Sequence, residues 1–235
     1  MSDARPGGSF TASAWRDIAG WRDAVAGMPF IRALADGSLA AEAFGFYLAQ
    51  DAAYLVEFAR ALSVASHLAP TRPGQTFFAG SAHQALEVES VLHRDWLSRH
   101  GAAQDVPVSP VTAAYTDHLL AVGSRDGYPV LVAALLPCYW LYAHIGTVVL
   151  AEAGDMGAHP YGQWIATYAD PAFQEAARTA CDLADQAADS ADATTRGRML
   201  TMFARSSMHE YLFFDQGMSR PDWPTPPTAR LTDRA

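Results

Sequence analysis

The sequence predicts an all-α protein that folds as one helical bundle, on three observations. Ala, Leu and Glu recur through long stretches, Gly and Pro lie mainly between these stretches, and no segment shows the alternating β-branched pattern of a strand. No Gly/Ser-rich or charged linker divides the 235 residues, and no internal repeat is visible. With 50% hydrophobic residues, the chain can form a single domain with a continuous buried core.

Proline and glycine mark the boundaries of eight predicted helices, because Pro interrupts a helix interior and Gly commonly ends a helix. In chain order the helices are 12–27; 40–68, followed by Pro70 and Pro73; 74–99, followed by Gly101; 110–122, preceded by Pro107 and Pro110; 130–153, opened by 126–129; 159–169; 171–190; and 194–217.

The sequence also predicts a flexible N-terminus (1–10), a helical domain (11–218) and an irregular tail (219–235) that is rich in proline. The N-terminus has no basic stretch followed by an apolar run, which predicts a cytoplasmic protein without a secretory signal. The longest apolar candidate, 129–150, is interrupted by Pro137, Tyr142 and His144, and is interpreted as a buried helix rather than a membrane span.

Charge and composition exclude several classes of function. The net charge is -9, which argues against nucleic acid and anionic membranes as partners. All sixteen basic residues are Arg, so chemistry that needs a lysine, such as Schiff-base formation or a P-loop, is excluded. Cys138 and Cys181 are too far apart in sequence to suggest a disulfide framework and are expected to be separate thiols.

A carboxylate lies within an aromatic stripe on the second predicted helix. Tyr47, Asp51, Tyr54 and Phe58 follow one another at i, i+4, i+7 and i+11, which places them on one face. A carboxylate among aromatic rings must find hydrogen-bond donors or have a raised pKa. Asp51 is therefore a candidate site residue, and the alternative is a structural Asp that bonds to a neighbouring helix.

A cysteine follows a proline inside the fifth predicted helix. Pro137 removes one helical hydrogen bond, so Cys138 is expected at a kink or opening, with Tyr142 one turn later on its face. Such a thiol is a candidate nucleophile. The alternative is a packing residue, because cysteine is among the most frequently buried residue types.

Near the C-terminus a second acid lies among apolar neighbours. Glu210 and Phe213 share a face, and Met199, Met202 and Phe203 continue the apolar side in earlier turns. A glutamate so placed is expected to have a raised pKa suited to general acid–base catalysis. The alternative is a Glu at the edge of the core.

Taken together, these segments resemble the thiaminase II (TenA) family, in the branch with an active-site cysteine. Their order and separation across about 170 residues make the resemblance specific. It rests on 46–51 with Tyr54 and Leu55; Tyr115; 137–140 with Tyr142 and Gly146; 159–161 with Trp164, Ile165 and Tyr168; and Ser206, Ser207, Glu210, Phe213 and Phe214.

The resemblance implies a heme-oxygenase-like helical bundle, usually a homotetramer, with one pocket per subunit and neither metal nor organic cofactor. It implies hydrolysis of 4-amino-5-aminomethyl-2-methylpyrimidine, and often of thiamine, to the 5-hydroxymethyl pyrimidine for thiamine salvage. Cys138 would be the nucleophile, Glu210 would move protons, and Asp51 would hold the aminopyrimidine edge and could help to deprotonate the thiol. The residues that would bind and stack the ring are Tyr47, Tyr54, Tyr115, Tyr142, Tyr168 and Phe213.

The chain departs from the family at three places, which leaves the shape of the pocket rim and the preferred substrate open. His209 precedes the glutamate where an aromatic residue is more frequent, Phe214 stands where Trp is frequent, and 52–53 are two alanines in place of a bulkier pair. An alternative function is a non-catalytic pyrimidine-binding or regulatory protein, although the chain retains all three candidate catalytic residues.

A metal-dependent oxygenase on the same fold is a weaker alternative. A heme enzyme of that kind would need a histidine in its first helix, whereas the first histidine is His67, and no glutamate has His three residues later. The best remaining metal candidate is a polar stripe on the third predicted helix, which is interpreted instead as a solvent-facing or subunit-facing surface of an amphipathic helix. The residues of this stripe are His83, Glu87, Glu89 and His93. Cys181 is interpreted as a packing thiol, and His144 as a core or interface histidine.

Overall fold

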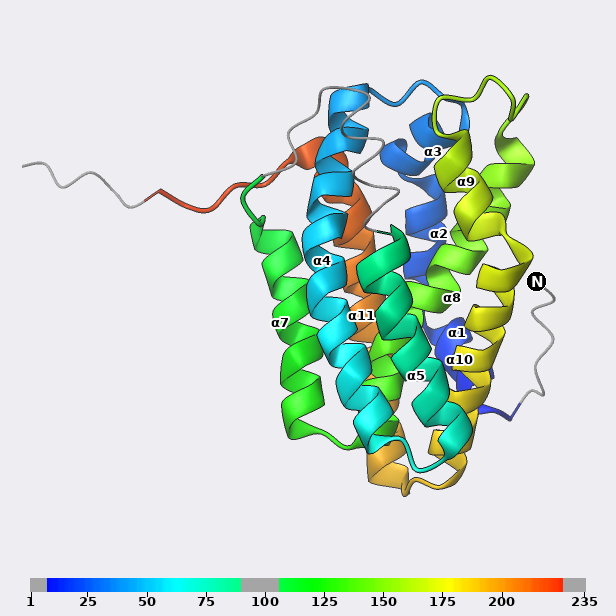
Figure 1. Cartoon of the computed structure of the whole chain (residues 1–235), viewed down its shortest axis with the longest axis vertical. Helices are drawn as coiled ribbons and strands as arrows, with labels where there is room; N and C mark the ends of the chain where they lie inside the picture. The colour runs from blue at the N-terminus through cyan, green and yellow to red at the C-terminus, as the bar shows by residue number, and fades with distance from the viewer. Residues whose placement is uncertain (1–7, 90–105, 226–235) are drawn as a thin grey trace, which may run out of the picture.

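The computed structural model describes residues 8–89 and 106–225, and the chain there folds into helices connected by short loops (Figure 1). The elements are α1 (Phe10–Asp17), α2 (Ala19–Gly27), α3 (Pro29–Ala35), α4 (Ala41–Leu68), α5 (Arg72–Gln84), the π-helix η1 (Ala85–Glu89), α7 (Pro110–Arg125), α8 (Tyr128–Glu152), α9 (Gly162–Ala169), α10 (Pro171–Asp189) and α11 (Ala193–Ser219).

The long helices α4, α5, α7, α8, α10 and α11 run roughly along the long axis of the bundle, and the short helices α1, α2, α3 and α9 pack along one side (Figure 1). Helix α8 packs against α7, α9, α10 and α11, while α4 packs against α5, α7 and α11. The described residues contain no strand, so the predicted all-α bundle is confirmed.

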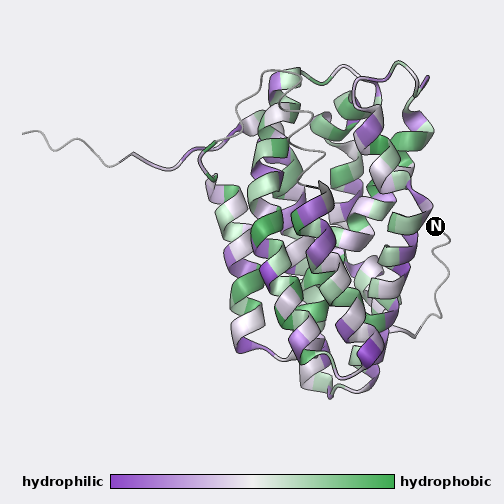
Figure 2. Cartoon of the chain, viewed as in Figure 1, coloured by the Kyte–Doolittle hydropathy of each residue, from purple (hydrophilic) through white to green (hydrophobic). Residues whose placement is uncertain are grey.

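Helix α8 lies in the core because it is apolar on nearly every face. By length and composition it could cross a membrane, but 78% of its most apolar stretch is buried inside the bundle. That burial supports its interpretation as a core helix. The outer helices are amphipathic instead, and Figure 2 shows hydrophilic residues on the outward surfaces of α5 and α10.

The N-terminal region differs from the sequence prediction. The single helix expected over 12–27 is two helices, because Ile18 has a non-helical backbone (φ -94, ψ 11) between α1 and α2. Helix α3 was not predicted, although Pro29 occupies its first turn, where proline is favoured.

The third predicted helix also differs from the prediction. It begins earlier, at Arg72, after the side chain of Thr71 caps the amide of Gly74. It then changes from α to π geometry at η1, and the remainder of the predicted 74–99 helix lies outside the described residues. Most of the predicted N-terminal segment 1–10 and the end of the tail, 226–235, also lie outside them.

A buried amide–hydroxyl network connects α4, α11 and the start of α7. Gln50 Nε2 donates to the carbonyl of Pro107 (2.9 Å), and the amide of Ser109 donates back to Gln50 Oε1 (2.9 Å). The Ser109 hydroxyl donates to Gln216 Oε1 (2.5 Å) on α11. Since all these groups are neutral and bonded, the network fixes three helices to one another without burying a charge.

The close packing of α8 against α9 gives a stability prediction. A Cβ at Gly146 would lie 2.6 Å from the backbone carbon and oxygen of Tyr168, which cannot move aside as a flexible side chain can. Gly146→Ala is therefore expected to lower the free energy of unfolding by about 1–3 kcal/mol, measured by urea denaturation.

The matched control for this prediction is Gly197→Ala in α11, where an added Cβ meets nothing within 4 Å. That change is expected to be neutral or to stabilise by about 0.5–1 kcal/mol, because alanine favours a helix over glycine. Equal stabilities for the two variants would contradict the tight α8–α9 contact.

Candidate active site

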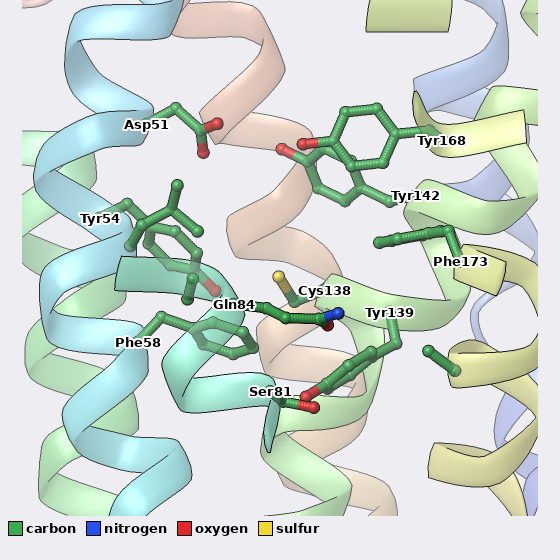
Figure 3. A pocket seen from close by; sticks show the side chains of 13 residues that line it. Asp51, Tyr54, Phe58, Ser81, Gln84, Cys138, Tyr139, Tyr142, Tyr168 and Phe173 are labelled. Atoms are coloured by element: carbon green, nitrogen blue, oxygen red, sulfur yellow. The ribbon is translucent and has the colours of Figure 1, made fainter. Parts of the chain in front are cut away.

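One cavity in the bundle brings together residues from α4, α5, η1, α8, α9 and α10, with about 550 Å³ of empty space including its open mouth (Figure 3). Its walls are mainly aromatic and aliphatic, with few polar groups, which is the usual composition of a small-molecule site. The lining residues are Asp51, Tyr54, Leu55, Phe58, Ser81, Gln84, Ala85, Cys138, Tyr139, Tyr142, Tyr168, Phe173 and Ala176.

Cys138 lies on α8 directly after Pro137, the only proline in the interior of that helix. Its side chain is half-buried, unlike the surrounding residues of α8, and its sulfur points into the cavity (Figure 3). Pro137 has no amide hydrogen, so one helical hydrogen bond is missing immediately before the thiol. The sequence predicted a kink or opening at this point, whereas α8 continues as one α-helix from Tyr128 to Glu152 with Pro137 inside it.

Asp51 reaches the cavity from α4 and is the only carboxylate among its lining residues. Its exposed fraction is 3%, and its neighbours on the same helix face, Tyr54 and Phe58, also line the cavity. The carboxylate and the thiol of Cys138 thus belong to one cavity although they lie on different helices (Figure 3).

Glu210 forms a buried pair with Tyr115 behind the cavity wall. The Tyr115 hydroxyl donates a 2.7 Å hydrogen bond to Glu210 Oε1, and both residues are at most 1% exposed. Burial raises the pKa of Glu210 to about 8; the Tyr115 hydrogen bond lowers it and the nearby Asp51 raises it. Glu210 therefore holds a proton at neutral pH and can release it slightly above neutrality.

Aromatic rings line the cavity on the side of this pair. The ring of Tyr54, which lines the cavity, lies 4.9 Å from the ring of Tyr115 and 5.3 Å from that of Phe213. On the opposite side the rings of Tyr142 and Tyr168 are 4.9 Å apart, and both line the cavity. A flat heterocycle would therefore have aromatic surface on two sides.

Tyr47 lies deeper and connects the two sides of the wall. Its hydroxyl is 3.1 Å from that of Tyr142, and its ring lies 5.8 Å from that of Phe213. Burial raises the pKa of Tyr47, Tyr54 and Tyr142 well above the usual value, so all three hydroxyls are neutral hydrogen-bonding groups at physiological pH.

Of the nine predicted site residues, the structure places five directly on the cavity: Asp51, Tyr54, Cys138, Tyr142 and Tyr168. The other four, Tyr47, Tyr115, Glu210 and Phe213, lie in the layer behind it. The sequence analysis missed Ser81 and Gln84 on α5 and Phe173 and Ala176 on α10. Each pair is spaced i, i+3, but nothing in the sequence separates such positions from an ordinary amphipathic face.

The remaining sequence candidates lie elsewhere. His83 and Glu87 are exposed, the side chains of Glu89 and His93 are outside the described residues, and no group of three or more metal-binding side chains occurs within 8–89 and 106–225. Cys181 is fully buried in α10, and His144 packs edge-on against Trp15 (5.4 Å), so both lie in packed surroundings as expected.

Similar proteins include two that are named for thiamine biosynthesis and several named aminopyrimidine aminohydrolase. The chain is 37% identical over 219 residues to the thiamine biosynthesis multifunctional protein ThiED of Corynebacterium efficiens, covering 93% of this chain and 29% of that protein. It thus spans less than a third of that relative. It is also 31% identical over 220 residues to the aminopyrimidine aminohydrolase of Halalkalibacterium halodurans, covering 92% of this chain and 98% of the relative.

Solved structures show the same architecture. A protein described as a TenA family transcription regulator from a Silicibacter species superposes with a TM-score of 0.81 at 27% identity, over 90% of this chain and 97% of that one. A Shewanella denitrificans domain of unknown function with a heme oxygenase-like fold superposes at 0.66 over 89% of this chain and 92% of that one, with 11% identity, which confirms the predicted fold. The model of the TENA/THI-4/PQQC family matches residues 15–220, and the chain belongs to this family.

Proposed function

We propose that the protein is an aminopyrimidine aminohydrolase of the thiaminase II type. It would convert 4-amino-5-aminomethyl-2-methylpyrimidine, and thiamine where the rim admits it, to the 5-hydroxymethyl pyrimidine. The observation that carries the proposal is the joint placement of the Cys138 thiol and the Asp51 carboxylate on one aromatic-walled cavity, with the Glu210–Tyr115 pair directly behind. The aminopyrimidine aminohydrolase relatives support it.

The proposed chemistry begins with the thiolate of Cys138, whose thiol proton passes to the Asp51 carboxylate on the same cavity. The thiolate adds to the ring carbon beside the one that bears the exocyclic methylene, and the ring nitrogen takes up the electron pair with a proton. Loss of aromaticity lets the ring expel the amine or thiazole from the methylene. Water then adds to the methylene, and expulsion of the thiolate restores the aromatic ring, so the net change is substitution of the leaving group by hydroxide.

Glu210 is proposed to supply and recover the proton in this sequence. A carboxyl with a pKa of about 8 is protonated at neutral pH, so it can protonate the ring or the leaving group and take the proton back later. Asp51 is proposed to accept hydrogen bonds from the amino edge of the pyrimidine, and the Tyr54, Tyr142 and Tyr168 rings to hold its faces.

The proposal is tested by mixing the purified protein with the aminomethyl pyrimidine and following ammonia. Ammonia and the hydroxymethyl pyrimidine are expected in equal amounts, and thiamine is tested in parallel as the substrate with the larger leaving group. Binding of the pyrimidine without release of ammonia, unaffected by Cys138→Ser, would support a non-catalytic binding protein instead.

We also propose a homotetrameric assembly, which the family resemblance implies, and the cytoplasmic location predicted from the sequence. Light scattering of the purified protein measures the first directly: a mass near four times 25.3 kDa is expected, and a monomeric mass at assay concentrations would contradict it.

A further inference from the structure

The imidazole of His209, which has no hydrogen bond to another described residue, lies flat against Tyr115, the hydrogen-bond partner of Glu210. His209 precedes Glu210 on α11, and its ring stacks on that of Tyr115 with centroids 5.1 Å apart and planes 6° from parallel. The residue is 6% exposed, and neither ring nitrogen bonds to any other described group. What His209 offers its surroundings is therefore the flat face of the ring.

A second histidine holds this ring from α7. His118 lies one turn after Tyr115 on α7 and stacks on His209 with centroids 5.2 Å apart. His118 Nε2 is in turn 3.0 Å from the Ser206 hydroxyl, one turn before His209 on α11. The rings of Tyr115, His209 and His118 thus form one packed group along the α7–α11 contact.

Both imidazoles are neutral at physiological pH. Burial and, to a smaller extent, the charge of Arg205 lower the pKa of His209 to about 4. Burial likewise lowers the pKa of His118 to about 4, followed by the influence of His209 and Arg205. The group therefore brings a polarisable flat surface next to Glu210 without bringing a positive charge.

We infer that His209 is a positioning residue: its neutral ring fixes the plane of Tyr115, so that the Tyr115 hydroxyl stays directed at the Glu210 carboxylate. The geometric reason is that Tyr115 makes two contacts with adjacent residues of α11, its face on His209 and its hydroxyl on Glu210. With the face held, rotation of the ring away from Glu210 would break a stacked contact. The consequence for turnover rests on the proposed function.

If the Tyr115 hydroxyl no longer pointed at Glu210, the pKa of Glu210 would change measurably. The Tyr115 hydrogen bond favours the charged carboxylate and so lowers the pKa of Glu210. The other titratable groups that interact with Glu210 or its tyrosine partners come from α4 and α8 and remain in place when His209 is replaced. They are Tyr47, Asp51 and Tyr54 on α4, and Cys138 and Tyr142 on α8; Tyr168 on α9 interacts with Tyr142 and also remains in place.

The test compares His209→Leu, which keeps the volume but loses the flat ring, with His209→Phe, which keeps the ring but loses the nitrogens. The Glu210 carboxyl carbon is titrated by ¹³C NMR in the free protein, with Glu210→Gln used to assign its signal. In His209→Leu the midpoint is expected to rise by about one pH unit as the Tyr115 bond loosens. His209→Phe is expected to titrate like the wild type.

Kinetics give a second measurement. In His209→Leu, kcat for the aminomethyl pyrimidine is expected to fall about tenfold with KM little changed, because one charge-assisted hydrogen bond is weakened in the acid–base step. Tyr211→Leu is the matched control. Tyr211 lies two residues after His209 on α11, and its replacement also removes an aromatic contact, with Trp21 at 5.5 Å, but Tyr211 does not stack on Tyr115. Its titration and kcat are expected to be unchanged.

An unshifted Glu210 titration in His209→Leu overturns the inference, and so does a shift in His209→Phe as large as in His209→Leu. Neither result depends on turnover. A wild-type protein that releases no ammonia, with the titration shift present, would refute the proposed function and leave the positioning role of His209 intact.

Discussion

Cys138→Ala is expected to reduce kcat for hydrolysis of the aminomethyl pyrimidine by on the order of 10³ or more, with the fold intact. The reason is that the proposed pathway begins with a covalent bond from the sulfur, and no other lining residue of the cavity carries a thiol. Cys138 is half-buried, so the smaller side chain leaves little new cavity in the core. Single-turnover kinetics and circular dichroism measure the two expectations.

Cys181→Ala is the matched control for this experiment. It removes the other thiol, which is fully buried in α10 and does not line the cavity. The expected result is unchanged kcat with a loss of stability on the order of 1 kcal/mol. If Cys138→Ala retained more than about a tenth of the wild-type kcat, the cysteine would not be the nucleophile, and direct attack by water would have to replace covalent catalysis.

Glu210→Gln is expected to lower kcat by about 10²–10⁴, the usual range for losing a general acid–base group. Glutamine has nearly the same shape and can still accept the hydrogen bond of Tyr115, but it cannot give up or take a proton. In the wild type, kcat/KM is expected to fall as the pH rises through about 8, where the buried acid loses its proton. In the variant this pH dependence should disappear.

Glu210→Gln is expected to raise stability, although it lowers activity. Folding raises the pKa of Glu210 from an ordinary value of 4.5 to about 8. The wild-type protein is therefore most stable below pH 4.5, and its free energy of unfolding falls as the pH rises from there to about 8. Glu210→Gln has no such loss. Relative to the wild type its free energy of unfolding should therefore increase over that range, by on the order of a few kcal/mol.

The control for Glu210 is Glu175→Gln, an exposed acid on α10 that pairs with Arg178. Neither the pH profile nor the stability is expected to change by much, since exposed ion pairs contribute little. A variant Glu210→Gln with wild-type kcat would show that another group carries the proton, and Asp51 would be the next residue to replace.

The sequence predicted those parts of the fold and site that depend on local periodicity. The stripe through Asp51 and Tyr54 is a property of one helix, and the structure places both residues on the cavity. The raised pKa of Glu210 was likewise expected from its apolar neighbours, and burial is its main cause. In both cases the pattern along one helix was enough to predict that the residue faces the interior.

What the sequence did not predict is either a local change of backbone angle or a contact between segments far apart in the chain. The break at Ile18 is a local change of backbone angle that apolar periodicity does not register. Ser81 and Gln84 line the cavity only because α5 packs against α4, and their side chains would suit a solvent-facing position equally well. The contact between Tyr115 and Glu210 joins residues 95 apart in sequence, and no spacing rule predicts it.

The amide–hydroxyl network of Gln50, Ser109 and Gln216 places the proposed catalytic groups under different constraints. It ties together the three helices that carry Asp51, Tyr115 and Glu210, whereas Cys138 stands on α8, which the network does not include. The two acids and Tyr115 should therefore keep fixed relative positions during thermal fluctuations, while the position of the sulfur depends on the packing of α8 against α11 and on the Tyr47–Tyr142 contact (3.1 Å).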